Sequence, residues 1–251
     1  MKVVIVGAAG FIGSYLVEHL TKNHTVIPIY KDTVNVFNNT DVRIFLENNV
    51  PDLIINCLSF GEGRGNNSED VGKNISSFYS FYSNQDLFKH YINIGSGIEE
   101  TDKDSAYAFS KKLIASRMIS KKWFNLIVYG CFGKHEKPSR LLQQFLTSKD
   151  IFKIQNDRYF DYISIQDFAN VITAVAGNID NIYMPNNITC VYDKKIKISN
   201  FLSIFCDINN LEKRYSVESE SDEAYTGYSN LHEVPELTLY GIGHGMREYI
   251  I

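Results

Sequence analysis

Short apolar runs alternate with longer amphipathic segments through the first half of the chain. Five runs rich in Val, Ile, Leu and aromatic residues predict buried strands, at 2–6, 25–30, 52–58, 91–95 and 124–130. Apolar residues at helical spacing predict helices between them, at 11–22, 73–89 and 105–120, and a short helix through Glu47 that Thr40 or Asp41 would cap. This alternation is typical of α/β proteins, so we expect a doubly wound parallel sheet with helices on both faces.

The pattern loosens after Gly130. The sequence there predicts a helix at 138–148, an extended segment YFDYISI at 159–165 and a helix at 166–176. No internal repeat, low-complexity tract or linker separates this part from the first. We therefore expect residues 1–130 to form the sheet unit, and residues 131–251 to form a smaller α/β cap that is interleaved with the last elements of the sheet unit at about 159–177.

The composition excludes several classes of protein. The 251 residues include 25 basic and 29 acidic side chains, which gives a formal net charge of −4, and 44% of them are hydrophobic. A disordered chain would be poorer in apolar residues, and a nucleic-acid-binding protein would carry a basic excess. No apolar run is long enough to cross a membrane, and the first residues lack the layout of a signal peptide. We expect a cytoplasmic protein with no membrane or nucleic-acid partner.

The four cysteines are widely separated, at Cys57, Cys131, Cys190 and Cys206. Zinc sites and disulfide frameworks usually show close or regular cysteine spacings, and no CxxC pair is present. We therefore expect reduced, mostly buried thiols and no metal site.

A glycine-rich turn, GAAGFIG, joins the first predicted strand to the first predicted helix. Gly7 permits a tight exit from the strand, Gly10 lets the backbone approach a pyrophosphate, and Gly13 lets the helix pack closely on the sheet. The N-terminus of the helix would offer N–H groups and a partial positive charge to the phosphates. We expect this turn to bind a dinucleotide through Gly7, Ala9, Gly10, Phe11, Ile12 and Gly13.

The end of the second strand bears on which dinucleotide binds. A carboxylate at this position accepts hydrogen bonds from the adenosine ribose and repels a 2′-phosphate. Tyr30 and Lys31 occupy the junction here, and Asp32 follows. Contact of Lys31 with the ribose would favour NADP(H), which is the cofactor that we expect, whereas contact of Asp32 would favour NAD(H).

The segment YAFSK places Tyr107 and Lys111 four residues apart, on the same face of a helix. A nearby ammonium group favours the phenolate form of a tyrosine, so the pair is suited to proton transfer. Ser96 lies eleven positions before Tyr107, directly after a predicted strand, where its hydroxyl would face the ligand crevice of a doubly wound sheet. Asn74, in the preceding helix, could hold a water or a backbone group that orients Lys111.

These motifs together resemble the extended short-chain dehydrogenase/reductase family, which acts mainly on nucleotide sugars. The resemblance rests on GAAGFIG, Asn56 at the end of a strand, Asn74, Ser96, YAFSK and the later FDYISIQDFANVI. It implies a Rossmann fold, a catalytic Ser96, Tyr107 and Lys111 triad, a C-terminal substrate cap and a homodimer built on paired helices. It also implies that Cys57, Leu58 and Ser59, after the third predicted strand, bind the cofactor.

Within that family the chain is most similar to the nucleotide-sugar 4-ketoreductases, such as GDP-fucose synthase and dTDP-4-dehydrorhamnose reductase. The loop SFGEGRGNN, which contains Arg64, resembles a glycine-rich loop over the active site in that branch. The dehydratases carry an Asp-Glu pair directly after the catalytic Ser or Thr, but Gly97 and Ile98 follow Ser96 here. Ile98 also replaces the epimerising cysteine of fucose synthase. The resemblance therefore implies reduction of a 4-keto-6-deoxy sugar nucleotide.

The residues expected to contact the substrate are Arg64, Ser96, Gly97, Gly130, Lys134, His135 and Arg140. Gly130 aligns best with an asparagine that the family uses near the nucleotide phosphates, and the basic residues could bind a diphosphate. Arg158 and Tyr159 are weaker candidates of the same kind, and Asp167 is interpreted as an acid that fixes a helix start. Two alternatives stay open: a sugar-nucleotide 4-epimerase with tightly bound NAD, and a non-catalytic NADP(H)-binding protein of the same fold.

Overall fold

The chain forms two compact units. The computed structural model describes residues 1–61, 67–101, 105–120 and 122–249. The first unit comprises Met1–Ile127 and Val175–Ile188, and the second comprises Val128–Ala174 and Thr189–Ile251.

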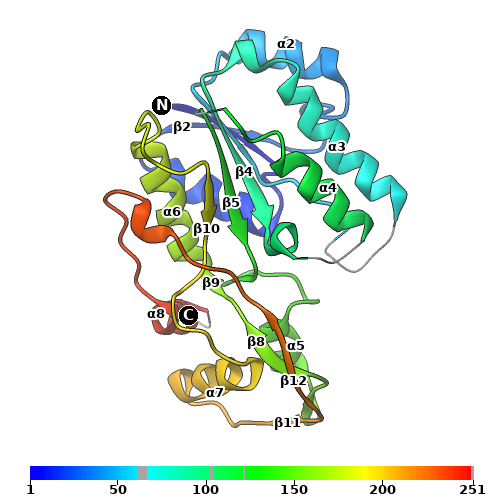
Figure 1. Cartoon of the computed structure of the whole chain (residues 1–251), viewed down its shortest axis with the longest axis vertical. Helices are drawn as coiled ribbons and strands as arrows, with labels where there is room; N and C mark the ends of the chain where they lie inside the picture. Colours follow the sequence, from blue (N-terminus) through cyan, green and yellow to red (C-terminus); the bar gives the residue numbers. More distant parts are fainter. Residues whose placement is uncertain (62–66, 102–104, 121, 250–251) are drawn as a thin grey trace. The chain divides into compact units, whose positions relative to one another are not determined.

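The first unit is built on a six-stranded parallel sheet of order β10-β5-β4-β3-β1-β2 (Figure 1). Its strands are β1 (Lys2–Val6), β2 (Thr25–Ile29), β3 (Leu53–Asn56), β4 (His90–Ser96), β5 (Trp123–Val128) and β10 (Asn187–Thr189). The predicted parallel α/β sheet is thus confirmed. Because β2 and β3 lie on opposite sides of β1, the strand order reverses there, and ligands of such sheets bind beyond the carboxyl ends of the strands at this point.

Three helices, α2 (Asn39–Asn49), α3 (Ser68–Tyr82) and α4 (Ala106–Ala115), cover one face of the sheet, and α1 (Phe11–Leu20) covers the other (Figure 1). The core under α2 and α3 contains Val42, Leu46, Phe78 and Phe81, all at most 1% exposed. Apolar side chains at helical spacing therefore produce the predicted layers.

The predicted cap of α2 is wrong. Asn38 caps this helix, because its Oδ1 accepts hydrogen bonds from the N–H groups of Thr40 and Asp41, the two residues proposed as caps. The helix predicted at 73–89 also begins earlier and ends earlier, since Asn67 caps its start. It ends before Asn84, whose Nδ2 donates to the carbonyl of Ser80. A 3₁₀ turn, η1 (Gln85–Leu87), follows.

The second unit combines three parallel strand pairs with helices: β6 (Cys131–Phe132) with β9 (Ile163–Ser164), β7 (Phe152–Ile154) with β11 (Tyr215–Val217), and β8 (Asp157–Phe160) with β12 (Glu220–Tyr225). Its helices are α5 (Leu141–Thr147), α7 (Ile198–Asn209), α8 (Ile242–Glu248) and most of α6 (Ile165–Gly177), with a 3₁₀ turn η3 (Leu231–Glu233). Its core is aromatic, and the rings of Tyr162 and Phe201 stack with their centroids 3.8 Å apart.

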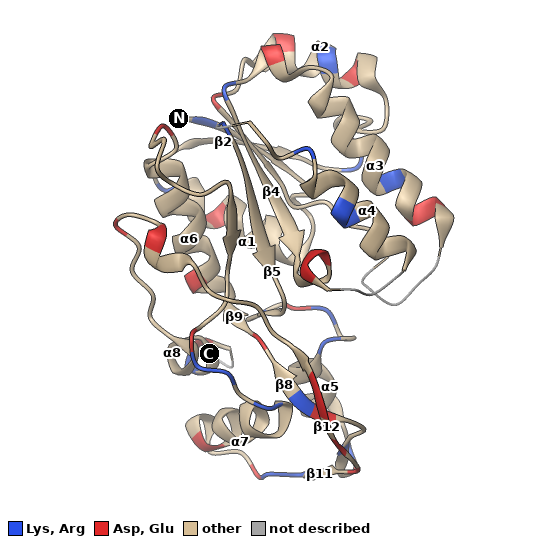
Figure 2. Cartoon of the chain, in the orientation of Figure 1, with Lys and Arg blue, Asp and Glu red and all other residues tan. Residues whose placement is uncertain are grey.

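Charged residues are frequent on the strands β8 and β12 and the loops beside them, and the ribbon in Figure 2 shows the acidic stretch of β12 beside basic neighbours. Glu220 pairs with Lys197 at 2.7 Å, and Glu223 pairs with Arg158 at 3.5 Å. Both glutamates are largely exposed, so solvent screens these pairs and each contributes little to stability.

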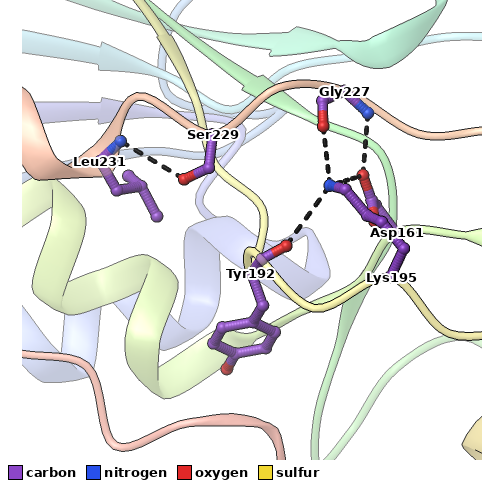
Figure 3. Close-up of polar contacts among 6 residues, drawn as sticks. All are labelled: Asp161, Tyr192, Lys195, Gly227, Ser229 and Leu231. Atoms are coloured by element: carbon purple, nitrogen blue, oxygen red, sulfur yellow. Dashed lines mark hydrogen bonds and ion pairs between the residues drawn. The ribbon is translucent and has the colours of Figure 1, made fainter.

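A different kind of pair joins Asp161 to Lys195 (Figure 3). Asp161 is 3% exposed, and its Oδ2 accepts from Lys195 Nζ at 2.6 Å and from the N–H of Gly227 at 2.8 Å. Lys195 Nζ also donates to the carbonyl oxygens of Gly227 and Tyr192, at 2.7 and 3.4 Å. The pair therefore fixes three segments that are distant in the sequence.

No helix in the described ranges combines the length and the apolar character that crossing a membrane requires.

Replacement of Lys195 by Ala should lower the free energy of unfolding by about 3 kcal/mol, because it leaves the buried Asp161 carboxylate without its cation. Lys197→Ala is the matched control, since its partner Glu220 is exposed, and a loss below about 1 kcal/mol is expected there. Urea unfolding of the three proteins would measure both differences. Equal losses in the two variants would contradict the assignment.

Candidate functional site

The glycine turn after β1 is formed by close backbone approaches. Gly7 has φ of +77°, and a Cβ there would lie 3.0 Å from the backbone nitrogen of Leu58, beyond β3. A Cβ at Gly13 would lie 2.2 Å from the carbonyl oxygen of Gly7, which no side chain can tolerate. The helix α1 begins at Phe11 with Gly10 as N-cap and with no side chain capping its first turn. Its N-terminus is therefore suited to an anionic ligand.

The turn after β2 presents both candidate cofactor-selecting residues to solvent. Thr33 fixes this turn, since its Oγ1 accepts from the N–H of Tyr30 and donates to the carbonyl of Tyr30, both at 2.8 Å. Tyr30 is 44% exposed, and Lys31 and Asp32 are exposed. The geometry is compatible with contact through either Lys31 or Asp32.

The residues after β3 lie against the glycine turn that follows β1. The N–H of Cys57 donates to the carbonyl of Val6 at 3.0 Å, and Ser59 Oγ lies 3.4 Å from the hydroxyl of Tyr107. Burial raises the pKa of the Cys57 thiol to about 12, so this thiol stays protonated and is a poor nucleophile at neutral pH. The other three cysteines are buried, as predicted, and all four are free thiols.

Tyr107 and Lys111 lie together on α4. Ser105 caps this helix by accepting from the N–H of Ala108 at 3.0 Å. Lys111 is only 3% exposed, and its Nζ lies 5.8 Å from the centre of the Tyr107 ring and donates to the carbonyl of Ile94 at 3.1 Å. This carbonyl belongs to β4, which ends at Ser96. A buried ammonium beside a phenol is an arrangement that can stabilise a phenolate.

Asn74 is buried in α3 and holds a segment of backbone rather than the lysine itself. Its Oδ1 accepts from the N–H of Phe60 at 2.9 Å, and its Nδ2 donates to the carbonyl of Phe60 at 3.0 Å. Nδ2 also lies 3.2 Å from Oγ of Ser110, the neighbour of Lys111. Asn74 therefore connects the segment after β3, which carries Ser59, to the helix that carries Tyr107.

Three polar residues that connect to Ser96 were not predicted from the sequence. They are the buried Asn93 in β4, the buried Asn125 in β5, and Glu99 in the 3₁₀ turn η2 (Gly97–Glu100). The sequence contained a signal for Asn93 and Asn125, because an asparagine inside a buried strand must find a hydrogen-bond partner.

The candidate substrate residues of the second unit are mostly exposed. Lys134, His135 and Arg140 lie on the surface between β6 and α5, and His135 has φ of +69°. Between them Glu136 is 6% exposed and accepts from the hydroxyl of Tyr249 at 2.8 Å, and burial raises the pKa of its carboxyl group. Exposure leaves the three basic side chains accessible to an anionic ligand.

Local packing explains the glycine at Gly130, because a Cβ there would lie 2.8 Å from the Phe160 ring and 3.1 Å from the carbonyl oxygen of Asp161. Arg158 pairs with Glu223, and Tyr159 is 43% exposed.

Asp167, at the start of α6, is fully buried. Its carboxylate accepts from the N–H groups of Tyr240 and Gly241, at 2.7 and 2.9 Å, and from the hydroxyl of Tyr192 at 2.5 Å. The carboxylate therefore fixes a segment distant in the sequence, whereas at the helix start it is the N–H of Asp167 that donates, to Ser164 Oγ at 3.1 Å.

Arg64 lies outside the described residues, as does most of the loop that contains it. Within the described residues, no three His, Cys, Asp or Glu side chains are placed to hold a metal ion.

The chain is similar in structure to enzymes of nucleotide-sugar metabolism. A UDP-glucose-4-epimerase from Stenotrophomonas maltophila, with bound NAD and formylated UDP-arabinopyranose, superposes with a TM-score of 0.85 at 12% identity, covering 99% of this chain and 96% of the other. A GDP-mannoheptose C4 reductase from Campylobacter jejuni with NADP bound gives a TM-score of 0.80 at 17% identity, covering 99% and 96%. A dTDP-4-dehydrorhamnose reductase from Clostridium acetobutylicum gives 0.80 at 16%, covering 100% and 98%.

These TM-scores establish a shared fold. The family model described as the NAD dependent epimerase/dehydratase family matches residues 3–77, which include the glycine turn, β2 and β3. The resemblance that the motifs predicted is therefore confirmed: residues 3–77 match the NAD dependent epimerase/dehydratase family, and the whole chain has the fold of NAD- and NADP-binding epimerases and reductases.

Proposed function

We propose that this protein is an NAD(P)H-dependent reductase that converts a 4-keto-6-deoxy sugar nucleotide into a 6-deoxyhexose nucleotide. The observation that carries the proposal is the buried Lys111 ammonium beside the Tyr107 phenol, on a helix that packs beside the carboxyl end of β4. Residues 1–130 would supply the cofactor site and the chemistry, and residues 131–251 would select the sugar nucleotide. The similarity to two C4-position reductases supports this class of reaction.

The residues of the glycine turn fit a dinucleotide. Gly7 and Gly13 permit the close backbone approaches that form the turn, and the uncapped start of α1 would face a pyrophosphate. When bound, the reduced nicotinamide supplies the hydride that a ketone reduction needs. Ser59, which lies 3.4 Å from the Tyr107 hydroxyl, would help to orient the phenol.

The proposed reaction uses the side chains of Ser96, Tyr107 and Lys111, and Asn74 supports them. Ser96 and Tyr107 would donate hydrogen bonds to the C4 carbonyl oxygen and so polarise the carbonyl. Tyr107 would then transfer its proton to that oxygen as the ketone becomes an alcohol. Lys111 would stabilise the phenolate that remains and would bind the ribose of the cofactor. Asn74 would keep the Phe60 segment against α4 and so keep Ser59 near Tyr107.

Tyr107→Phe should lower kcat by about 10²–10⁴-fold, because it removes the proton donor. Binding of NADPH should change little, since the ring and Lys111 remain. Tyr79→Phe is the control, because it removes a hydroxyl on α3 that binds only Arg117 among the contacts of the described residues. The assay follows loss of the reduced nicotinamide with a panel of 4-keto-6-deoxy sugar nucleotides. Near-normal turnover by Tyr107→Phe would contradict the mechanism.

A second candidate function is 4-epimerisation of a sugar nucleotide with a cofactor that stays bound. The high TM-score to an epimerase with bound NAD favours it. Purified protein that carries NAD(H) and turns over without added cofactor would support the epimerase. Tight NADP(H) binding without any turnover on the same panel would instead support the third alternative, a non-catalytic binding protein.

We expect NADPH to bind more tightly than NADH, through the exposed Lys31. Lys31→Ala should weaken NADPH about fivefold, which corresponds to about 1 kcal/mol for an exposed contact, and should leave NADH nearly unchanged. Lys22→Ala removes another exposed lysine and serves as the control. Fluorescence titration gives the four dissociation constants for the two variants. Weaker NADPH than NADH binding by the wild type would favour contact through Asp32.

A further inference from the structure

Three buried asparagines form a row of hydrogen bonds across the centre of the first-unit sheet. Asn56, Asn93 and Asn125 lie on β3, β4 and β5 and are 4%, 1% and 0% exposed. Asn56 and Asn93 are direct partners in the strand register, and Asn56 Nδ2 donates to Asn93 Oδ1 at 3.4 Å. Asn93 Nδ2 donates to Asn125 Oδ1 at 2.8 Å. The row therefore spans three adjacent strands.

Both ends of the row meet parts of the candidate site. At one end, Asn56 Oδ1 accepts from the N–H of Leu58 at 3.2 Å, beside the point where Gly7 approaches β3. At the other end, Asn125 Nδ2 donates to Glu99 Oε2 at 2.7 Å. The second oxygen of Glu99 accepts from the N–H of Ser96 at 2.8 Å. The row thus connects the glycine turn to Ser96.

The hydrogen bonds of this row have one direction. Every amide oxygen faces the Leu58 end, and every amide NH₂ faces Glu99. Only a group that accepts at both of its polar atoms satisfies Asn125 and the Ser96 N–H together, and an ionised carboxylate is such a group. Burial is the largest effect on the Glu99 carboxyl and raises its pKa, and the charge of Glu100 acts in the same direction, whereas Lys111, Asn125 and Ser96 lower the pKa and favour the ionised form.

The neighbouring residues leave room for this carboxylate. A Cβ at Gly95 would lie 2.7 Å from Asn125 Oδ1 and 2.9 Å from Glu99 Oε1. The end of β4 is held twice, since Lys111 donates to the Ile94 carbonyl and Glu99 accepts from the Ser96 N–H. The hydroxyl of Ser96 belongs to the same turn and accepts from the N–H of Ile98 at 3.4 Å.

We infer that Glu99 is a positioning residue that fixes Ser96 for the reaction, and that the asparagine row fixes the orientation of its carboxylate. This inference rests on the proposed function, because it assigns Ser96 a role in catalysis. Glu99 itself does not need to touch the substrate.

The first test is Glu99→Gln, which keeps the size of the side chain and one acceptor. Its amide places a donor against either Asn125 Nδ2 or the Ser96 N–H. If the side-chain amides of Asn56, Asn93 and Asn125 all flipped, the oxygen of Asn125 could accept from the new amide. The Nδ2 of Asn56 would then face the N–H of Leu58, so two donors would oppose each other there. We expect kcat to fall about tenfold, the equivalent of about 1.4 kcal/mol, with KM and the dissociation constant of NADPH changed less than twofold. Glu100→Gln, an exposed neighbour on the same turn, is the control.

The second test exchanges donor and acceptor between the two positions. In the double variant Glu99→Gln/Asn125→Asp the new amide donates to the new carboxylate, whose other oxygen still accepts from Asn93. The net charge is unchanged and every hydrogen bond of the row is restored. We expect kcat within about threefold of the wild type, whereas Asn125→Asp alone opposes two carboxylates and should be the least stable variant.

The outcomes separate this inference from the proposed function. If Tyr107→Phe is inactive and Glu99→Gln keeps the wild-type kcat, the inference is overturned and the proposed function stands. If the wild type reduces no 4-keto-6-deoxy sugar nucleotide, both fall. Should Glu99→Gln fail to fold, the double variant decides: a folded protein with wild-type kcat and KM supports the inference, and a folded protein with a tenfold lower kcat overturns it.

Discussion

The backbone at Gly7 has φ of +77° and passes so close to the residues after β3 that a Cβ would lie 3.0 Å from the backbone nitrogen of Leu58, and the candidate site depends on this approach. The contact brings the first residue of the glycine turn next to Cys57 and Leu58, and Ser59 follows directly. Ser59 in turn lies beside Tyr107. A parallel sheet makes this possible, because it places the ends of β1, β3 and β4 along one edge, although the residues concerned are far apart in the sequence.

Much of this arrangement could be predicted from the sequence, because local chemistry determines it. Runs of β-branched residues indicated the strands, the glycine spacing indicated the turn, and the four-residue spacing of Tyr107 and Lys111 placed them on one helical face. The alignment of Asn56 with Asn93 was not predictable in this way, since it depends on strand order and register. The capping of α2 by Asn38 was missed because several neighbouring polar residues could serve equally well from their type alone.

The second unit was harder to predict for a physical reason. Its strand pairs are short, with β6 and β9 only two residues long, so they have little periodicity to recognise. Its segments are joined by contacts between distant residues, such as the pair of Asp161 with Lys195 and the stacked rings of Tyr162 and Phe201. Asp167 shows the difference, because its type and place suggested a local role at the helix start, whereas its carboxylate binds the distant backbone at Tyr240 and Gly241.

The direction of the asparagine row also constrains how this chain can change over evolutionary time. A substitution of Asn125 that replaces its NH₂ donor by an acceptor removes the hydrogen bond to the Glu99 carboxylate. A side chain at Gly95 would displace the side chains of both Asn125 and Glu99. Single changes at these three positions are therefore costly, while paired changes preserve the hydrogen bonds. Among related sequences, residues 95, 99 and 125 are expected to covary as a group, so a divergent relative that differs at one of them should carry a compensating change at another.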